Sequence, residues 1–387
     1  MTEVCISSKQ GKIVGIVLPY LKSRGTEIQA LRIAEGLTRN NISVLVFVIQ
    51  GWGETNMYNL FKKIGVKVIN VGKPNDIGEK NISFIRVFSL IRLLYINKCN
   101  LIINRATLTC RVAGYAGLAL FIPVATVLSG CVNKTKINKY LRGLFTIFKF
   151  ILLGCPSKII SVSVEGGENF KTSYPLLSSR VYSIQNGVEV PELYIDNYQL
   201  EKDKNFVFCF SGSLDLNRKG IDILLHAMQI IIHTHRIKNV SLVLIGSGKD
   251  LDKIVKISKE LRIEKYVEFS GEVSDPISKI LNYNAFVLPS RREGLPNALL
   301  EAMSIGLPCI ASDCNTGPRE IISNKQNGLL TPSESLTELA NSMMKIYSSE
   351  TLRRYLGVNA RKTIKKSFLF DQMINRYIDV LDIKNDQ

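Results

Sequence analysis

The sequence has few residues of the kinds that build metal and disulfide sites. Its 387 residues include three histidines and eight cysteines, and no two cysteines form a CxxC pair. The spacing of these histidines and cysteines therefore does not match a zinc site. We expect the cysteines to be reduced thiols, as in a cytosolic protein. No GxxxxGK[ST] segment occurs, which excludes a P-loop nucleotidase. The first twenty residues lack a basic stretch followed by a sufficient apolar stretch, so we expect no secretory signal peptide.

Acidic residues are scarce in the first half of the chain. Residues 1–190 contain 24 Lys+Arg against 9 Asp+Glu, whereas residues 191–387 contain 26 against 24. The net charge of +17 therefore belongs almost wholly to the first half. This asymmetry favours an anionic membrane surface as a partner, at about 1 kcal/mol per basic residue. A solvated basic surface is the alternative. No nucleic-acid partner is expected, because no recognised nucleic-acid-binding module accompanies the basic residues.

One uncharged segment, residues 112–132, is long enough to span a membrane. Pro123 divides it into an Ala/Gly/Leu half, typical of a helix, and a β-branched half, typical of a buried parallel strand. We therefore expect a helix followed by a strand.

Short apolar runs alternate with helix-length segments along the whole chain. This alternation predicts an α/β fold of two doubly wound, Rossmann-like parallel-sheet domains that face a cleft. The predicted domains cover residues 1–190 and 191–370, with a polar linker at 191–205 and a C-terminal helix at 371–387 that crosses back to the first domain. Predicted strands lie at 12–18, 43–49, 67–71, 101–104, 124–127, 158–162, 181–184, 206–210, 242–245, 267–270, 285–288 and 308–311. Predicted helices include 27–39, 82–97, 221–232, 251–261, 276–282 and 297–305.

Two carboxylates stand out in the run RREGLPNALLEAMSIGLPCIASD. Glu293 follows a predicted strand, and Glu301 lies eight residues further on. Pro296 suits the first turn of the helix between them, so the two acids lie about two turns apart along it. This arrangement is suited to binding a polar ligand at two points. The alternative is a pair of acids on an exposed helix surface.

Two loops at predicted strand ends carry features of phosphate sites. In FSGSLDLNRKG, Gly212 ends the strand and is followed by Arg218 and Lys219, a pair of cations suited to a diphosphate. After the first strand, Gly25 would let the backbone approach a ligand and Thr26 would cap the next helix. A solvated basic turn and an ordinary capped turn are the respective alternatives. The third such loop, Gly246-Ser247-Gly248, lacks the third glycine of a dinucleotide fingerprint, which disfavours a nicotinamide dehydrogenase.

Taken in order, GSLDLNRKG, LIGSGKD, FSGEVSD, FVLPSRREGLPNALLEAMSIGLPCIASD and NGLL resemble family 4 retaining glycosyltransferases of the GT-B fold. The resemblance is strong over residues 206–332 and weak in the first half. The run SDCNTGPREIISNKQNGLL is similar to bacterial enzymes that add hexose or N-acetylhexosamine units to lipid-linked or surface polysaccharides. The resemblance implies transfer from a nucleotide sugar, expected to be a UDP-sugar, with no metal and no further cofactor.

The resemblance also implies roles for individual residues. Glu293, Lys219 and Arg218 form the implied catalytic set: Glu293 lies near the donor sugar, and the two cations hold the diphosphate. Glu301 would grip the ribose hydroxyls. The remaining implied donor-binding residues are Gly25, Gly212, Glu272, Val273, Gly294, Leu295, Pro296 and Asn297, of which Glu272 and Val273 would line the base pocket.

The sequence departs from the family pattern in three places. Ser213 stands where relatives often have arginine, and Ser129 stands where the first domain usually has a histidine on the acceptor side. The glycine loop reads RGTE, with Arg24 in the place of its first glycine. A serine cannot do what an imidazole does near neutral pH, so Ser129 is the weakest element of the implied site.

The acceptor side is expected to meet a membrane. Residues 134–154 mix basic with large apolar side chains, as an interfacial helix does, although a helix facing the core of the first domain fits equally well. We expect a cytoplasmic enzyme, peripheral on the inner face of the cell membrane, whose acceptor is a lipid-linked or surface glycan. The alternatives are a catalytically silent GT-B-fold protein that binds sugar nucleotide or membrane, and a GT-B phosphorylase, which would need pyridoxal phosphate on a lysine.

Overall fold

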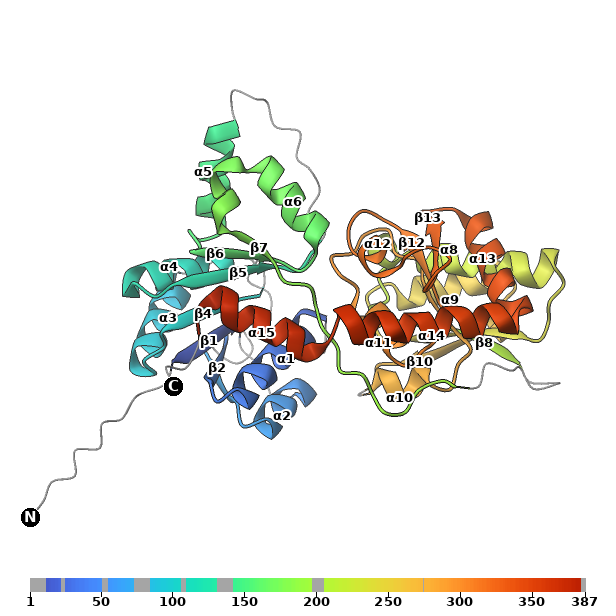
Figure 1. Cartoon of the computed structure of the whole chain (residues 1–387), viewed down its shortest axis with the longest axis horizontal. Coiled ribbons are helices and arrows are strands. Elements are labelled where there is room, and N and C mark those ends of the chain that lie inside the picture. Colours follow the sequence, from blue (N-terminus) through green and yellow to red (C-terminus); the bar gives the residue numbers. More distant parts are fainter. Residues whose placement is uncertain are drawn as a thin grey trace, which may run out of the picture.

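The computed structural model describes residues 12–21, 25–50, 55–72, 84–105, 109–130, 142–196, 205–273 and 275–383. Its strands form two parallel sheets, one in each half of the chain (Figure 1). The first sheet has the order β3-β2-β1-β4-β5-β6-β7. Its strands are β1 (Ile13–Leu18), β2 (Ser43–Val48), β3 (Lys67–Asn70), β4 (Leu101–Asn104), β5 (Val124–Leu128), β6 (Lys158–Ser161) and β7 (Val181–Ser183).

The second sheet has the order β10-β9-β8-β11-β12-β13. Its strands are β8 (Phe206–Ser211), β9 (Val240–Ile245), β10 (Val267–Gly271), β11 (Ala285–Leu288), β12 (Cys309–Asp313) and β13 (Leu329–Pro332). In both sheets the first strand of the domain pairs with the second and the fourth in chain order, so the strand order reverses there. Ligands of doubly wound sheets bind beside the carboxyl ends of the strands at such a reversal.

Helices cover both faces of the first sheet because its strands are apolar on both sides. Ile16 packs into the cluster that includes α1 (Gly25–Arg39) and α2 (Asn56–Lys63). Its neighbour Val17 packs into a second cluster, with α3 (Phe84–Ile96) and α4 (Cys110–Leu120). Successive side chains of a strand point to opposite faces, so β1 supports both layers. A third cluster lies where α5 (Arg142–Leu152) and α6 (Val164–Ser173) meet β6 and β7.

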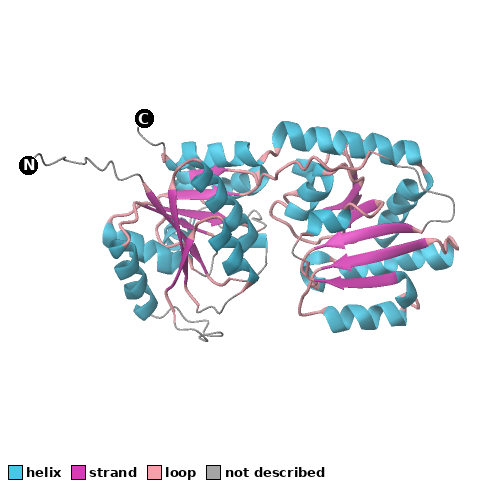
Figure 2. Cartoon of the chain, turned by 90° about the horizontal axis from the view of Figure 1, so that it is seen from below, coloured by secondary structure: helices cyan, strands magenta, loops and turns pink. Residues whose placement is uncertain are grey.

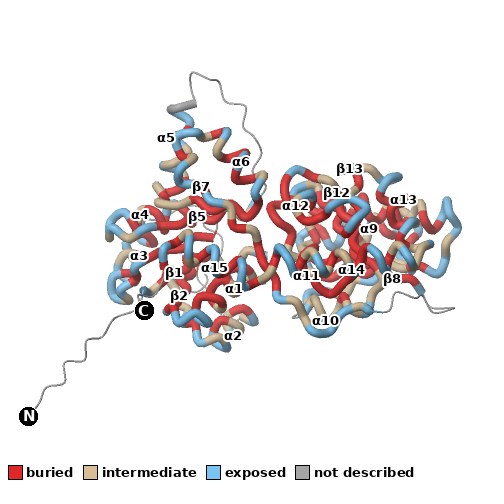
Figure 3. The backbone as a smooth tube through the Cα atoms, in the orientation of Figure 1, coloured by how far each residue is buried: buried red, intermediate tan, exposed pale blue. Residues whose placement is uncertain are grey.

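The helices of the second domain pack mainly on a core of Phe, Leu, Ile and Val (Figure 3). They are α7 (Leu216–Lys219), α8 (Ile221–Gln229), α9 (Leu251–Glu260), α10 (Pro276–Ile280), α11 (Asn297–Ser304), α12 (Pro318–Ile321), α13 (Leu336–Ser348) and α14 (Glu350–Ser367). A short 3-10 helix lies at Pro175–Arg180 in the first domain. The second domain has another at Glu264–Tyr266 and a π-helical segment at Ile230–Thr234.

The chain passes between the domains twice, and the two crossings pair with each other. The Val188 N–H donates to the Phe368 carbonyl, and the Phe370 N–H donates to the Val188 carbonyl. After this crossing α15 (Phe370–Leu381) packs against α1 of the first domain (Figure 1). Figure 2 shows the two domains side by side, each with strands between helices. Its Tyr377 hydroxyl lies 3.3 Å from Nη1 of the buried Arg105 at the end of β4. Burial raises the pKa of Tyr377, and the Arg105 charge opposes this rise.

The predicted fold class is confirmed: both domains are α/β units with parallel sheets. The helix-then-strand prediction around Pro123 is also correct, since α4 precedes it and β5 follows it. In the described parts of the chain, every helix is too short or too polar to cross a membrane. Strand β13 was not predicted from the sequence. Residues 197–204 of the predicted linker and 134–141 of the predicted interfacial helix lie outside the described residues.

Candidate active site at the domain interface

The loop after β8 brings two predicted cations to the carboxyl end of that strand. The Asp215 side chain accepts from the Arg218 N–H at 3.2 Å and caps α7. Gly220 ends α7 in the left-handed conformation (φ 60°), and a Cβ there would lie 2.2 Å from the Pro289 carbonyl oxygen. Only glycine fits this position, and the tight turn leaves Arg218 exposed and Lys219 buried.

Lys219 and Glu293 form a buried ion pair. Lys219 Nζ lies 2.6 Å from Glu293 Oε1, and 11% and 8% of the two side chains are exposed. The Ser290 hydroxyl donates to the same oxygen at 2.6 Å, while the Thr316 hydroxyl donates to the Glu293 carbonyl at 2.6 Å. A charged pair buried this far is stable only with such additional hydrogen bonds. These contacts fix the Glu293 carboxylate in one position at the end of β11.

Arg218 contacts one of the residues at which the sequence departs from the family pattern. Its Nη2 donates to the Ser213 hydroxyl at 2.6 Å, so the side chain lies over the end of β8. The predicted base-pocket residues lie at the end of β10: Glu272 is exposed and accepts from the Ser247 hydroxyl at 3.1 Å. Val273 is half-buried against the core.

The glycines after β8 and β9 pack against each other. A Cβ on Gly246 would lie 2.0 Å from the Gly212 carbonyl oxygen, and one on Gly248 would lie 2.3 Å from the Leu214 carbonyl oxygen. Both positions therefore require glycine for loop packing, because neither contact leaves room for a side chain. This packing explains the Gly246-Ser247-Gly248 pattern without a dinucleotide.

Arg291, the first residue of the RREG run, holds the loop that carries Glu293. Its Nη1 and Nη2 donate to the two carboxylate oxygens of Asp222 at 2.8 and 2.7 Å, and Nη1 also donates to the Leu216 carbonyl at 2.7 Å. Burial alone would raise the pKa of Asp222, but the Arg291 contacts outweigh it and the pKa is lowered. The pair ties the loop before α11 to α7 and α8.

The turn between Glu293 and α11 touches the first domain. A Cβ on Gly294 would lie 2.4 Å from the carbonyl oxygen of Ser129, the residue that follows β5. Ser129 is half-buried at this contact. Leu295 and Pro296 are buried, and Pro296 is the N-cap residue of α11, one position before its first helical residue, Asn297. The predicted acceptor-side serine and the predicted donor-binding turn are therefore in direct contact.

Helix α1 faces α11 across the same interface. Gln29 Nε2 and Asn186 Nδ2 donate to Asn297 Oδ1 at 2.8 and 2.9 Å. Arg32 Nη2 lies 2.6 Å from Glu301 Oε1, and 18% and 12% of the two side chains are exposed. Sequence reasoning missed Gln29, Arg32 and Asn186. The available signal was the helical spacing of Gln29 and Arg32 from Gly25, which places all three on one face of α1.

The predicted glycine loop needs one correction. Helix α1 begins at Gly25, so Thr26 lies inside the helix and does not cap it. Gly25 itself is exposed and faces the second domain, since a Cβ there would lie 3.8 Å from Asn297 Nδ2. Arg24 lies outside the described residues.

A further contact between the domains uses Glu320 of α12, which the sequence analysis did not single out. Its carboxylate accepts from the Val164 and Glu165 N–H groups at 2.8 and 2.9 Å and from Gln185 Nε2 at 2.9 Å. The Val164 and Glu165 N–H groups belong to the first turn of α6, where the helix dipole favours a negative charge. Glu320 thus ties the second domain to the carboxyl end of β6.

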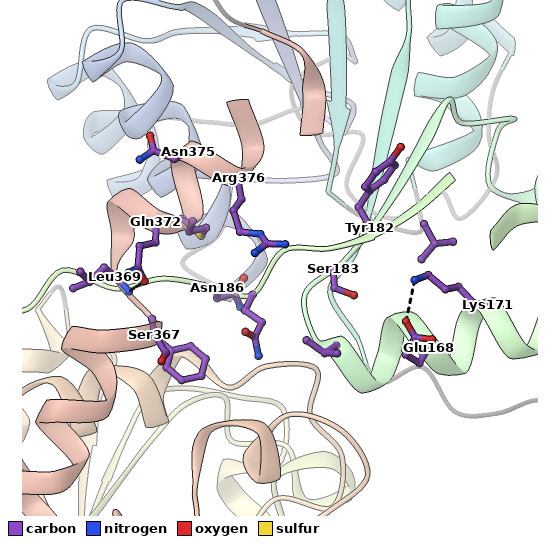
Figure 4. Close-up of a pocket in the computed structure, with 15 residues that line it drawn as sticks. Glu168, Lys171, Tyr182, Ser183, Asn186, Ser367, Leu369, Gln372, Asn375 and Arg376 are labelled. Atoms are coloured by element: carbon purple, nitrogen blue, oxygen red, sulfur yellow. Dashed lines mark hydrogen bonds and ion pairs between the residues drawn. The ribbon is translucent and has the colours of Figure 1, made fainter. Parts of the chain in front are cut away.

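A cavity of about 710 Å³ lies beside this contact, where the chain crosses between the domains (Figure 4). Its walls are α6, the segment from β7 to Asn186, and the start of α15. The Lys171–Glu168 ion pair of 2.9 Å lies on its α6 side. Among the described residues, none of the predicted site residues lines it, and Asn186, whose amide reaches Asn297, connects it to the candidate site.

Nearly all the predicted site residues therefore gather at the carboxyl ends of β8, β11 and β5 and on the facing ends of α1 and α11. Within the described ranges no cluster of three His, Cys, Asp or Glu side chains could hold a metal ion. The two facing parallel-sheet domains have the GT-B fold.

A family match falls in the second domain. Residues 195–363 match the family described as glycosyl transferases group 1. The family resemblance predicted from the motifs is confirmed.

Individual relatives agree with this assignment. The chain is 28% identical over 230 residues to the capsular polysaccharide biosynthesis glycosyltransferase CapM of Staphylococcus aureus. This match covers 56% of this chain and 59% of CapM. It is 24% identical over 321 residues to the UDP-Gal:alpha-D-GlcNAc-diphosphoundecaprenol alpha-1,3-galactosyltransferase of Escherichia coli, covering 78% of this chain and 82% of that protein. The chain spans between half and two thirds of the length of the first curated relatives it matches.

The whole fold matches a solved structure as well. The crystal structure of Anabaena HepE in complex with UDP and glucose superposes with a TM-score of 0.78 at 18% identity. It covers 95% of this chain and 99% of that chain, so the likeness includes both domains.

Proposed function

We propose that this protein is a retaining glycosyltransferase that moves a hexose or N-acetylhexosamine from a UDP-sugar to a lipid-linked or surface-polysaccharide glycan. The observation that carries the proposal is the buried Lys219–Glu293 pair at the ends of β8 and β11, beside the turn that touches the first domain. The E. coli relative uses UDP-galactose and a diphosphoundecaprenol acceptor by its name, and HepE was crystallised with UDP and glucose.

In the proposed reaction, the bond between the anomeric carbon and the diphosphate oxygen breaks. The acceptor hydroxyl oxygen bonds to the same carbon from the same face, and its proton passes to an oxygen of the leaving diphosphate. Negative charge develops on that diphosphate, so fixed cations aimed at it lower the barrier. Arg218 and Lys219 would supply this charge, which makes a metal unnecessary in the proposal. No cofactor beyond the nucleotide sugar is invoked.

Glu293 would act from a position that its neighbours already fix. Ser290 and Lys219 both bond to Oε1, which leaves the carboxylate little freedom to rotate. Such preorganisation matters because an acid beside the donor sugar must not reorganise during bond breaking. Glu301 would hold the ribose hydroxyls, and the N–H groups at the start of α11 would approach the donor.

The acceptor side is proposed to lie on an anionic membrane. Helix α5 exposes Leu144, Phe145, Ile147, Phe148 and Ile151 with exposed fractions of 46–66%, at the spacing of one broad helix face. Figure 3 shows part of α5 coloured as exposed. On α3, Ile85, Phe88 and Tyr95 are 68–75% exposed. Residues 80–164 contain twelve Lys+Arg and not one Asp or Glu. Exposed apolar side chains in a segment that carries basic residues and no acids fit an anionic lipid surface better than water.

A binding and turnover screen tests the proposed function. Thermal shift across UDP-, GDP- and TDP-sugars identifies the donor, and mass analysis of a lipid extract incubated with that donor identifies the product. We expect a shift with a UDP-sugar and a lipid-linked product that is one sugar heavier. Binding without transfer would instead support the silent GT-B-fold alternative, and absorbance of a lysine-bound pyridoxal phosphate would support a phosphorylase.

A further inference from the structure

The cavity beside the domain crossings has no role in the proposed function. Its volume of about 710 Å³ falls within the range of small-molecule sites in proteins, about 300–1,000 Å³. Helix α6 contributes Glu168 and Lys171 to its wall, and α15 contributes Met373 and Arg376. Between the two helices run β7 and the segment that leads to Asn186. Two helices and a strand therefore define its shape.

One end of the cavity lies at the domain interface. There the Val164 N–H donates to Glu320 of the second domain, and the Asn186 amide donates to Asn297 Oδ1 at 2.9 Å. Val164 and Lys171 both line the cavity and lie two helical turns apart on α6, so the cavity extends about 10 Å along this helix. Its other end, at Lys171, therefore lies away from the candidate active site.

Three side chains of the lining carry polar groups that no other described residue binds. Arg376 and Asn375 are exposed on α15, and Ser183 is half-buried at the end of β7. In the described parts of the chain none of the three side chains has a hydrogen-bond or ion-pair partner. Figure 4 shows Arg376 pointing from α15 into the space between Asn186 and Ser183. These polar groups are therefore available to a ligand.

The lining combines one unbalanced positive charge with apolar surface. The Lys171 ammonium is paired with Glu168 at 2.9 Å, whereas Arg376 has no acidic partner among the described residues. Phe368 lines the same cavity and is buried, and the Tyr182 ring is 37% exposed. We therefore expect a ligand that carries a negative charge and also offers apolar surface.

The chemistry of a sugar acid matches all parts of this lining. A hydrocarbon ligand would cover Arg376, Asn375 and Ser183 without binding them, which costs free energy. An inorganic anion would bind Arg376 and leave most of the volume to water. A sugar acid has apolar C–H faces, hydroxyl groups that both donate and accept, and a carboxylate that an arginine binds with two nitrogens.

We propose that this cavity is a saccharide site separate from the candidate active site, which binds an acidic segment of a glycan with its carboxylate on Arg376. Asn186 lines the cavity and bonds to Asn297 at the start of α11, so the two sites are neighbours. The glycan held in the cavity is the acceptor, bound at a sugar away from the hydroxyl that reacts. Only this identification with the acceptor rests on the proposed function.

Calorimetric titration of the full chain with two acidic tetrasaccharides, one of galacturonic acid and one derived from hyaluronan, tests the site. At least one of them should bind, and Arg376→Ala should weaken that binding about tenfold or more, because a charge-assisted contact is lost. Arg376→Lys should recover part of the loss. Arg354→Ala, which removes an exposed arginine of α14, is the control and should bind as wild type does. Hydrogen exchange with the bound probe should slow at residues 181–186 and 367–376.

Two further probes separate the sugar rings from the charge. Maltotetraose has the rings without carboxylates, and tetraglutamate has carboxylates without the rings, so both should bind at least about tenfold more weakly than the acidic tetrasaccharide. Equal binding of tetraglutamate would show that the basic charge of the protein alone attracts the probes, and would overturn the saccharide site. Equal binding of maltotetraose, or an unchanged Arg376→Ala, would overturn the role of Arg376.

The acceptor role has a kinetic readout. With a lipid-linked acceptor that carries an acidic sugar, Arg376→Ala should raise the KM for the acceptor about tenfold and leave kcat within about twofold, because Arg376 does not touch the reacting atoms. An unchanged KM would overturn the acceptor role. Wild-type protein that binds UDP but neither acidic tetrasaccharide more tightly than about 1 mM would overturn the saccharide site alone. Wild-type protein that binds a tetrasaccharide but transfers no sugar would overturn the proposed function and support the site.

Discussion

The carbonyl oxygen of Ser129 approaches the backbone of Gly294 so closely that a Cβ on the glycine would lie 2.4 Å away. Ser129 directly follows β5 of the first domain, and Gly294 follows the buried Glu293 of the second. The residue next to the proposed catalytic acid is therefore also one of the places where the domains touch.

The first prediction concerns this contact. Gly294→Ala should push the domains apart by the width of a methyl group and lower the rate of sugar transfer by about a hundredfold, since a misplacement of about 1 Å has effects of this size. Steady-state kinetics measures the rate, and small-angle scattering measures the separation. Gly130→Ala is the matched control, because a Cβ there meets nothing within 4 Å. Equal rates for the two variants would contradict the prediction.

The second prediction concerns the anchor formed by Glu320. Glu320→Gln keeps the shape of the side chain but leaves one oxygen where two now accept from the Val164 and Glu165 N–H groups. Hydrogen exchange at the start of α6 should become at least about tenfold faster, because the freed amides open to water. Glu338→Gln, at the exposed start of α13, is the control. Unchanged exchange in α6 would show that Glu320 does not hold the domains together.

The third prediction concerns acid stability through Asp222 and Arg291. The folded pKa of Asp222 lies below its unfolded value of about 3.9, so the pair stabilises the fold above that pH and loses its effect as pH falls through the folded pKa. Because both side chains are partly exposed, Asp222→Asn should lower the free energy of unfolding by only about 1 kcal/mol at pH 7. Urea unfolding between pH 2 and 7 should show this difference shrinking below about pH 4. A difference in the free energy of unfolding that grows on acidification would contradict this prediction.

The fourth prediction concerns the membrane. The protein should co-sediment with phosphatidylglycerol vesicles and much less with phosphatidylcholine vesicles, and added salt should weaken the binding. Phe145→Ser/Phe148→Ser removes two exposed aromatic side chains from α5 and should reduce binding about tenfold or more. Leu336→Ser/Val358→Ser, at exposed positions of the second domain, should not. Binding that ignores both salt and lipid charge would rule out the proposed surface.

Most strands could be predicted because each is marked by an apolar run within its own short segment of sequence. The run Ala285–Leu288 is buried on both faces, so its continuous apolar character marked the strand without further information. Strand β13 was missed because Leu329–Pro332 is short and contains a proline, which a sequence pattern places at an edge or in a turn. It lies at the edge of its sheet, paired only with β12 among the described strands.

The candidate site was predictable one domain at a time. Arg218, Lys219 and Glu293 follow strands, and the carboxyl ends of parallel strands share one edge, so their proximity could be expected. The pairing of Arg32 with Glu301 could not, since the two residues are 269 positions apart and on different domains. No periodicity within one segment encodes the orientation of two domains. The same reason hid Glu320, whose partners are backbone amides at the start of α6.

The central claim is that Lys219 and Glu293 belong to a sugar-transfer site, and release of UDP from a UDP-sugar in the presence of a bacterial lipid extract tests it most directly. Wild-type protein should release UDP and extend a lipid-linked glycan by one sugar. Lys219→Ala should lose at least about a hundredfold in rate while keeping a cooperative unfolding transition, because the leaving diphosphate then lacks a fixed cation. Equal rates for wild type and Lys219→Ala, or no UDP release by the folded wild type with any donor, would contradict the account.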